Sequence, residues 1–193
     1  RMPGRDVEQR YVDILTTVKA AVSIPVAVKL APFFSSAGEV VIRLDRAGAD
    51  GLVVFNRFMQ TDIDPETFTV STGLKLSNPA EAALPRSWIA RLRGLVGASL
   101  AASTGVETAA DVAAYLLAGA DVVMTTSSLL RHGPSHAAVL IDELTEWLKS
   151  KGFSGVDDVR GLLAVPAGAH GSAFERAGYL TAIEEATRTY GPH

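Results

Sequence analysis

The apolar residues of this chain follow two spacings, one typical of helices and one typical of buried strands. Helical spacing occupies residues 7–22, 40–47, 84–95, 137–148 and 174–190. Between them lie short, continuously apolar runs at 24–30, 51–56, 98–102 and 121–125. Strands that are apolar at every position are covered on both faces, as parallel strands between helices are. The pattern therefore predicts four parallel strands, each followed by a helix.

Residue types at the predicted helix starts agree with this alternation. Asn78, followed by proline and then Glu81, is typical of a capped first turn. Thr108 with Asp111 gives the same signal and opens the helix after the third strand. The polar, Thr-rich segment 61–76 predicts a hairpin or another excursion after the second strand.

Four such units amount to half of a known α/β architecture. A closed (β/α)8 barrel of the TIM type has eight strands in about 250 residues. We predict about half of such a barrel over residues 1–150 and a C-terminal helical extension over 151–193, with a loop at 164–173. Half a barrel leaves two bare sheet edges and an interior that we expect Val, Leu and Phe side chains to line. The expected partner is therefore a second copy, forming a homo-oligomer, or a complementary N-terminal barrel half, with the extension packed on the barrel or on the partner.

Composition removes several function classes. The net charge is −3 and no basic run occurs, which argues against nucleic acid as a partner. No apolar run reaches the roughly 18 residues that span a bilayer, so we expect no membrane partner and a cytoplasmic location. The chain lacks cysteine, which removes thiolate ligands. His132 and His136 have a helical metal spacing, but Gly133-Pro134 interrupts the helix, and we predict no metal site.

The candidate chemistry lies where the last two strands end. The third strand runs into Ala102–Val106 and the fourth into Thr125–Ser128, and both loops consist largely of Ser, Thr and Gly. In a βα barrel such paired loops bind phosphate, because backbone N–H groups and helix N-termini point at the anion. The same residue types also close turns and cap helices without any ligand. The loops alone therefore leave both interpretations open.

Five short segments, taken together, carry a resemblance that none carries alone. They are Val26–Pro32, Phe55-Asn56, Leu76–Asn78, Ala102–Val106 and Thr125–Leu129. In order and spacing they resemble the lysine strand, the asparagine strand, the Leu-Ser-Gly turn and the two phosphate loops of the dihydroorotate dehydrogenase family. The resemblance extends from about Val7 to Gly133. It implies an FMN-dependent oxidoreductase of pyrimidine biosynthesis that passes a hydride from a small, dihydropyrimidine-type substrate to the flavin.

The resemblance also implies roles for individual residues. Asn56 and Arg57 would contact the substrate. FMN would be held by Lys29, Ser77, Ser103, Thr104, Gly105, Thr126 and Ser127. Lys29 would place a fixed cation at the pyrimidine edge of the flavin, where reduction adds negative charge. Without the resemblance, Lys29 would be interpreted as the partner of an acid at the barrel rim, and Asn56 as a strand-end cap.

The chain also departs from the family pattern. Thr104 and Thr126 stand where the family has glycines in its phosphate loops. Arg57 stands where the main family has a small hydroxyl residue or similar, which favours a different or more acidic substrate. The family's catalytic base, a Cys or Ser on a loop before the lysine strand, has no counterpart in residues 1–28. We expect the base outside this chain. The alternatives are a non-catalytic half-barrel subunit or assembly component and, if the resemblance misleads, another phosphate-binding barrel from amino-acid biosynthesis.

Overall fold

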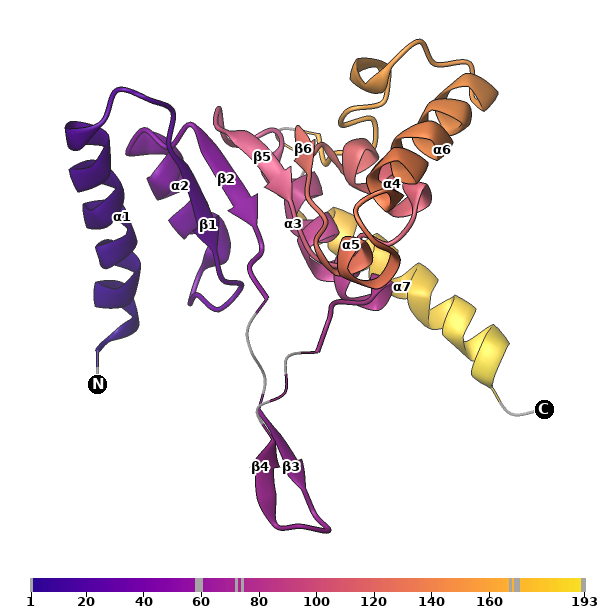
Figure 1. The fold of residues 1–193 in the computed structure, drawn as a ribbon, viewed down its shortest axis with the longest axis horizontal. Coiled ribbons are helices and arrows are strands. Elements are labelled where there is room, and N and C mark those ends of the chain that lie inside the picture. Colours follow the sequence, from indigo (N-terminus) through magenta and orange to yellow (C-terminus); the bar gives the residue numbers. More distant parts are fainter. Residues whose placement is uncertain are drawn as a thin grey trace.

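A four-stranded parallel sheet forms the centre of the molecule (Figure 1). The computed structural model describes residues 2–57, 61–71, 73, 75–166, 168 and 171–191, and for residues 171–177 only the backbone. The strand order is β1 (Ala27–Leu30), β2 (Gly51–Val54), β5 (Ser99–Ala102) and β6 (Val122–Val123). All neighbouring pairs are parallel, and the strands follow one another in chain order. The predicted half of a TIM-type barrel is confirmed.

One helix precedes β1, and helices follow each strand of the parallel sheet, as the hydrophobic spacing predicts. They are α1 (Gly4–Ala21), α2 (Ala37–Arg46), the 3-10 helix η1 (Pro79–Ala82), α3 (Ala83–Leu92), α4 (Ala109–Ala118), α5 (Ser127–His132) and α6 (His136–Ser150). Both predicted caps are present: the Asn78 side chain accepts from the Ala80 N–H, and the Thr108 side chain accepts from the Asp111 N–H. These caps fix where the loops before η1 and α4 end.

All four strands are shorter than predicted, and pairing sets the limits of the two outer ones. β1 begins at Ala27, whose register partner Gly51 is the first residue of β2. β6 consists of Val122 and Val123 alone, since its neighbour β5 ends at Ala102. Beyond that residue both chains turn into the loops that carry the candidate chemistry.

The two faces of the sheet differ in composition. Side chains of a strand alternate between faces, and residues in parallel register share a face. The face toward the helices is apolar, and these side chains are at most 1% exposed: Leu30, Leu52, Val54, Leu100 and Ala102. The other face, which we call the open face, carries Ala27, Gly51 and Ser99 in one row and Lys29, Val53, Ala101 and Val122 in the next.

The expected lining of the interior by Val, Leu and Phe is therefore wrong in large part. The leucines point to the helices, and Phe55 packs edge-to-face on Trp88 of α3 with ring centroids 6.3 Å apart. Val53 and Val122 are the valines on the open face, and Val122 is 51% exposed. The continuous apolar runs hide an alternation of large side chains toward the helices and small or polar ones toward the open face.

Two predicted helix faces also need correction. In α3 the buried residues are Pro85, Ile89 and Leu92, whereas Leu84 is exposed. The helix ends at Leu92, so the other expected apolar position, at residue 95, lies beyond it and is exposed. In α6 Ile141 is 64% exposed, although its neighbour at 140 is buried. The buried stripe of α3 is therefore displaced from the predicted one, and that of α6 is narrower than expected.

The predicted excursion is a hairpin that projects from the body (Figure 1). Its strands β3 (Asp62–Asp64) and β4 (Thr69–Ser71) are antiparallel. Asp62 pairs with Lys75 at 3.0 Å, and both side chains are largely exposed. Asp62 is thus an exposed charge that is paired within the hairpin segment.

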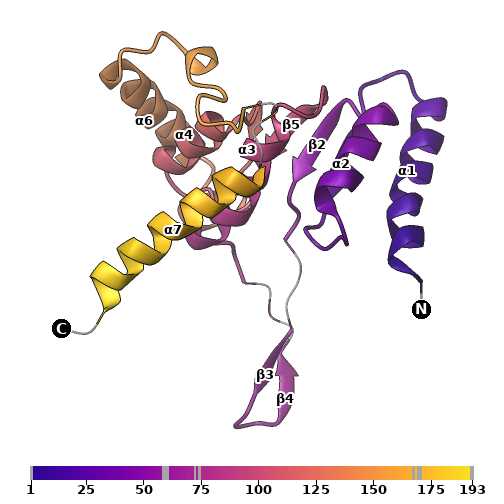
Figure 2. The same cartoon turned by 180° about the vertical axis from the view of Figure 1, so that it is seen from behind.

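The C-terminal extension has two parts. Residues 161–165 return to the body through backbone bonds from Gly161 to Leu116 (2.9 Å) and from Val165 to Ala90 (2.8 Å); they follow the 3-10 helix η2 (Val156–Asp158). Residues 167, 169 and 170 of the predicted loop lie outside the described residues. Helix α7 (Gly171–Tyr190) then points away from the sheet (Figure 2), and its described side chains up to residue 190 are exposed. The first part thus packs on the body, whereas the side chains of residues 178–190 do not.

Within the described ranges, no helix combines the length and the apolar character that crossing a membrane requires.

Candidate functional site

One hollow at the C-terminal ends of the strands brings together all nine residues that the sequence singled out. These are Lys29, Asn56, Arg57, Ser77, Ser103, Thr104, Gly105, Thr126 and Ser127. The cavity has a volume of about 150 Å³, and Val106, Met124 and Thr125 complete its lining. Parallel strands end at one edge of their sheet, which explains why loops far apart in the sequence meet here.

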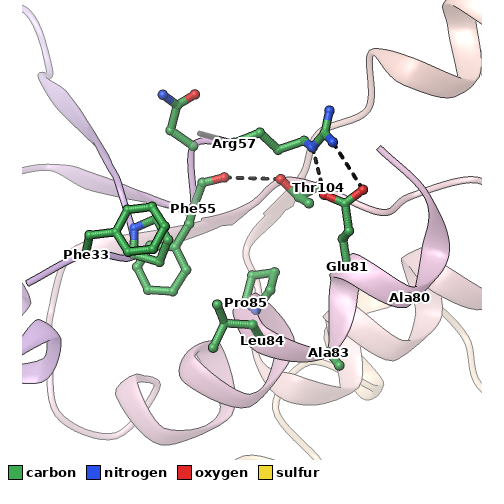
Figure 3. Close-up of a pocket in the computed structure, with 11 residues that line it drawn as sticks. Phe33, Phe55, Arg57, Ala80, Glu81, Ala83, Leu84, Pro85 and Thr104 are labelled. Atoms are coloured by element: carbon green, nitrogen blue, oxygen red, sulfur yellow. Dashed lines mark hydrogen bonds and ion pairs between the residues drawn. The ribbon is translucent and has the colours of Figure 1, made fainter. Parts of the chain in front are cut away.

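The loop after β5 presents its backbone to this hollow. The Ser103 hydroxyl donates to the Phe55 carbonyl at 2.6 Å, and the Thr104 hydroxyl donates to the same oxygen at 3.3 Å (Figure 3). Both hydroxyls are thus occupied by the neighbouring chain segment. The N–H groups of Thr104 and Gly105, by contrast, donate to no other described residue. Two successive free N–H groups in a turn are suitable donors for an anion.

The same loop has an unusual backbone. Thr104 has a φ of 85° and Gly105 a φ of 73°. A Cβ on residue 105 would lie 2.7 Å from the Ala82 nitrogen and 2.9 Å from the Asn78 oxygen, so glycine is required there. For the threonine a left-handed conformation costs about 1–2 kcal/mol. The loop therefore keeps a glycine-like course with a threonine in place of the family's first glycine.

Tyr115 of α4 stabilises this conformation, and sequence reasoning missed it. Its hydroxyl donates to the Thr104 carbonyl at 2.7 Å and lies 3.3 Å from the Ser103 carbonyl. The side chain is fully buried, and burial raises the pKa of the phenol, so the hydroxyl stays a donor. In the sequence Tyr115 is simply one more residue of an apolar helix.

The loop after β6 is linked to the turn before η1. Ser127 Oγ accepts from the Ser77 N–H at 3.0 Å and from the Ser77 hydroxyl at 2.9 Å. Thr125 Oγ1 donates to the Val106 carbonyl at 2.9 Å, which joins this loop to the one after β5. Thr126, the second glycine replacement, is exposed at the edge of the hollow. The predicted candidates of both loops are therefore close neighbours, but most of their hydroxyls bind protein.

A cluster around Glu107 holds the two loops together, and no pattern in the sequence indicates it. The Glu107 carboxylate accepts from the Arg131 guanidinium at 2.5 Å and from His132 Nε2 at 2.6 Å. Arg131 also donates to the Ser77 carbonyl at 2.5 Å. The hydrogen bond from His132, followed by the charge of Arg131, lowers the pKa of Glu107. The carboxylate is thus ionised and ties the loop after β5 to α5.

The two histidines behave differently from expectation. They lie on separate helices, α5 and α6, as the Gly133-Pro134 break indicated, yet their ring centroids are only 4.7 Å apart. Glu107 brings them together, because its carboxylate binds His132 and its carbonyl accepts from His136 Nε2 at 3.0 Å. Among the described residues no group of three or more His, Asp or Glu is placed to hold a metal ion.

The Arg57 guanidinium already binds groups of the same chain. Its Nε lies 2.7 Å from Glu81 Oε2 (Figure 3). The guanidinium also donates to the Lys75 carbonyl. Glu81 in turn accepts from the Asn78 N–H at 3.1 Å. Arg57 therefore joins the beginning of the hairpin excursion to its end. It also forms part of the wall of a second cavity of about 360 Å³, which is lined mainly by apolar residues such as Phe33 and Pro85.

Lys29 and Asn56 are the exposed polar groups of the site. Lys29 lies on the open face in register with Val53 and Ala101. Within the described part of the chain its ammonium group has no acidic partner, so the rim ion pair suggested as an alternative is not formed there. Asn56 donates its backbone N–H to the Leu30 carbonyl at 2.6 Å, but its side chain caps no described backbone group. Both side chains are available for a ligand.

Comparisons with known proteins agree with this geometry. The family described as "Dihydroorotate dehydrogenase" matches residues 5–148. The catalytic subunit of dihydroorotate dehydrogenase B (NAD(+)) from Halalkalibacterium halodurans is 31% identical over 147 residues, which are 75% of this chain and 48% of that protein. The same subunit from Listeria monocytogenes is 31% identical over 161 residues, which are 81% of this chain and 52% of that protein.

A solved structure gives the same result. The ligand-free dihydroorotate dehydrogenase of Eimeria tenella superposes with a TM-score of 0.60 at 28% identity, covering 72% of this chain and 40% of that one. The chain spans about half the length of the curated relatives it matches. The family match includes every residue that lines the hollow. The chain therefore belongs to the dihydroorotate dehydrogenase family.

Proposed function

We propose that this chain binds FMN through its phosphate and forms the C-terminal half of an oxidoreductase that acts on a dihydropyrimidine-type substrate. The observation that carries the proposal is the hollow itself. Two free N–H groups, of Thr104 and Gly105, and the unpartnered cation Lys29 surround it. Donors and positive charge without an internal acceptor are suited to a bound anion.

The size of the hollow supports a phosphate rather than a whole cofactor inside it. At about 150 Å³ it is smaller than typical pockets for drug-sized ligands. Ser77, Ser103, Thr126 and Ser127 would complete the phosphate end, and the remainder of FMN would extend over the open face toward Lys29. When bound, FMN would accept a hydride from a saturated carbon of the substrate.

This chain's own residues would position and stabilise the reacting groups. The Lys29 ammonium would stabilise negative charge that develops beside it. The Asn56 amide can donate to and accept from a cyclic amide or carboxylate of the substrate. Arg57 would shape the substrate wall rather than supply free charge, because Glu81 and the Lys75 carbonyl already bind its guanidinium.

A partner would supply what residues 1–150 do not. We propose that they are one half of the barrel, that residues 151–193 are an extension, and that the other half brings the catalytic base. Apolar residues are exposed at both flanks of the sheet, Ile14 and Ile24 on the β1 side and Leu130 on the β6 side. Exposed apolar groups at both edges favour a covering partner, either a complementary N-terminal half or a second copy.

A second candidate is a non-catalytic half-barrel subunit. The observation that favours it is the replacement of two loop glycines by Thr104 and Thr126, which add bulk where a phosphate would approach. In that case the chain would keep the fold without turnover. Flavin binding without flavin reduction, even in the presence of the complementary half, would support this candidate.

The direct test is the visible absorbance of the purified full chain, with mass identification of anything released on denaturation. We expect a flavin spectrum and the mass of FMN, or binding of added FMN in preference to riboflavin, which lacks the phosphate. A colourless protein that binds neither would refute the proposed cofactor. Equal affinity for FMN and riboflavin would refute the phosphate assignment alone.

A further inference from the structure

We infer that the buried hydroxyl of Tyr115 is a positioning group, which holds Thr104 in its left-handed conformation and so gives the anion-binding loop the shape that a glycine would otherwise provide. Its relevance to FMN rests on the proposed function. The local claim, that the hydroxyl and the conformation of Thr104 depend on each other, does not.

The first part of the argument is the strain at Thr104. Its φ of 85° lies in the region that favours glycine, and a β-branched side chain there is a clear outlier. The next residue, Gly105, is also left-handed and packs directly on the backbone of η1. The turn must therefore be held by contacts from outside it, because the intrinsic preference of threonine opposes it.

Contacts to the carbonyl side of the turn come from Tyr115. The hydroxyl donates to the Thr104 oxygen at 2.7 Å, and the Ser103 oxygen lies 3.3 Å away. A phenol has one proton, so the shorter contact is the principal bond and the longer one a shared acceptor. The bond fixes the direction of the peptide group between Thr104 and Gly105, and therefore the direction of the N–H of Gly105, a residue that lines the hollow.

Tyr115 is itself held rigidly. The Arg86 guanidinium lies 5.3 Å from the centre of its ring, and Arg86 pairs with Asp111 at 3.5 Å. Asp111 is also the capping partner in the first turn of α4. The phenol ring is fully buried in the main apolar cluster. A fixed donor of this kind can impose a conformation on a loop, which an exposed and mobile side chain cannot.

The other side of the turn is fixed as well. The hydroxyls of Ser103 and Thr104 both donate to the Phe55 carbonyl, and Figure 3 shows the Thr104 contact. Threonine thus gains one bond that glycine would lack, while Tyr115 stabilises the φ that glycine would adopt freely. Together, the Thr104 hydroxyl and the Tyr115 hydroxyl hold the loop in the conformation that a glycine at residue 104 would adopt without such contacts.

The competing explanation is that the hydroxyl only satisfies a buried polar group and has no connection with the threonine. The two explanations differ in a double-mutant cycle. If the hydroxyl offsets the strain at residue 104, its removal must matter less once residue 104 is glycine. If the hydroxyl only satisfies a buried polar group, Tyr115→Phe lowers the free energy of unfolding and the FMN affinity equally with threonine or glycine at residue 104.

The experiment compares the full chain with Tyr115→Phe, Thr104→Gly and the double variant. Free energies of unfolding are measured by urea titration, and affinities for FMN and riboflavin by flavin fluorescence. We expect Tyr115→Phe to weaken FMN binding about tenfold and riboflavin binding less than about twofold. With glycine at residue 104, the same change should cost less than about twofold for FMN. Tyr179→Phe, at an exposed position of α7, is the matched control.

Two results would overturn the inference. One is an equal loss of FMN affinity and of stability in both backgrounds. The other is full affinity for FMN in Tyr115→Phe. If the unmodified chain binds no FMN, the proposed function fails. The coupling between Tyr115 and Thr104 is then tested by the unfolding free energies of the double-mutant cycle alone. A non-additive cycle supports the coupling of Tyr115 to Thr104, and an additive one refutes it.

Discussion

The two faces of the parallel sheet are formed by the same strands but differ in the burial and polarity of their side chains. Leu30, Leu52 and Leu100 point to the helices and are at most 1% exposed. On the opposite, open face Lys29 and Ser99 are exposed. The helix face therefore provides the stability of this chain, while the open face carries the groups that can meet a ligand.

This division explains why half a barrel can retain a site. Apart from Val53, which is 8% exposed, the side chains of the open face are half-buried or exposed, so polar and small residues can stand there with little effect on folding. The same openness leaves reacting groups in contact with water, which weakens every electrostatic interaction among them. The helix face can therefore keep the fold stable whether or not the open face supports catalysis.

The largest expected effect concerns turnover. The chain loaded with FMN should not be reduced by dihydroorotate at an enzymatic rate, because a general base alone is typically worth about 10²–10⁴-fold. Adding the N-terminal half of the Halalkalibacterium halodurans relative should restore reduction. The measurement is loss of flavin absorbance after anaerobic mixing. Rapid reduction by the chain alone would place the base within it, and Ser77 and Ser103 would be the first candidates.

The next effect concerns stability. Leu52→Ala, on the helix face, should lower the free energy of unfolding by about 2–5 kcal/mol through a lost buried side chain and a cavity. Val122→Ala, on the open face, removes a side chain that is 51% exposed and should cost less than about 0.5 kcal/mol. Urea titrations of both variants give the comparison.

A large loss of unfolding free energy in Val122→Ala would contradict the conclusion that this part of the open face is uncovered. In that case the protein concentration should be varied. A cost that grows with concentration would mean that a second copy covers this face, since association adds stability by mass action. A cost independent of concentration would mean that the face is covered within the chain.

A substitution at Lys29 tests whether the open face contributes to ligand binding. Lys29→Ala should weaken FMN binding by about 1.5–3 kcal/mol or shift the flavin reduction potential, because a charge-assisted contact is lost. Its free energy of unfolding should not change, since within the described residues the ammonium has no partner to lose. Lys151→Ala, at an exposed position after α6, is the control. Unchanged affinity and potential would remove Lys29 from the site.

The sequence predicts the features that depend on local signals. The caps at Asn78 and Thr108 span three or four residues each, and both form as expected. Continuous apolar runs bounded by turn residues predict strands and their order. The convergence of the two Ser/Thr/Gly loops follows directly, because parallel strands that neighbour one another end at one edge.

The features that the sequence could not predict depend on distant partners. In a run such as Gly51–Val54 no polar residue indicates which side chains face the helices, so the composition of the open face was misjudged. The pairing of Arg57 with Glu81 spans 24 residues, and the bond from Arg131 to Ser77 spans 54. No local pattern marks such contacts. Tyr115 likewise differs from other core positions only by its hydroxyl.

The smallest expected effect is the pH dependence of the stability that the Glu107 cluster contributes between the loop after β5 and helices α5 and α6. The hydrogen bond from His132 lowers the pKa of Glu107 in the folded chain. The unfolded chain therefore binds the proton more readily, so the cluster contributes stability above the ordinary carboxyl pKa and loses it as pH falls through the lowered value. Arg131 and His132 face the carboxylate, His136 faces the Glu107 carbonyl, and Asp111 accepts from the Glu107 N–H.

Glu107→Gln isolates this contribution, since it leaves all those neighbours in place. At neutral pH the variant should be less stable than the unmodified chain by up to about 1 kcal/mol, because the ion pairs are partly exposed. At about pH 3.5 the difference should shrink, as protonation removes the same charge from Glu107 itself. Glu66→Gln, on the exposed hairpin, is the control. A difference that stays constant from neutral to acidic pH would mean that the Glu107 side chain acts by shape alone, and that the loops after β5 and β6 are held without its charge.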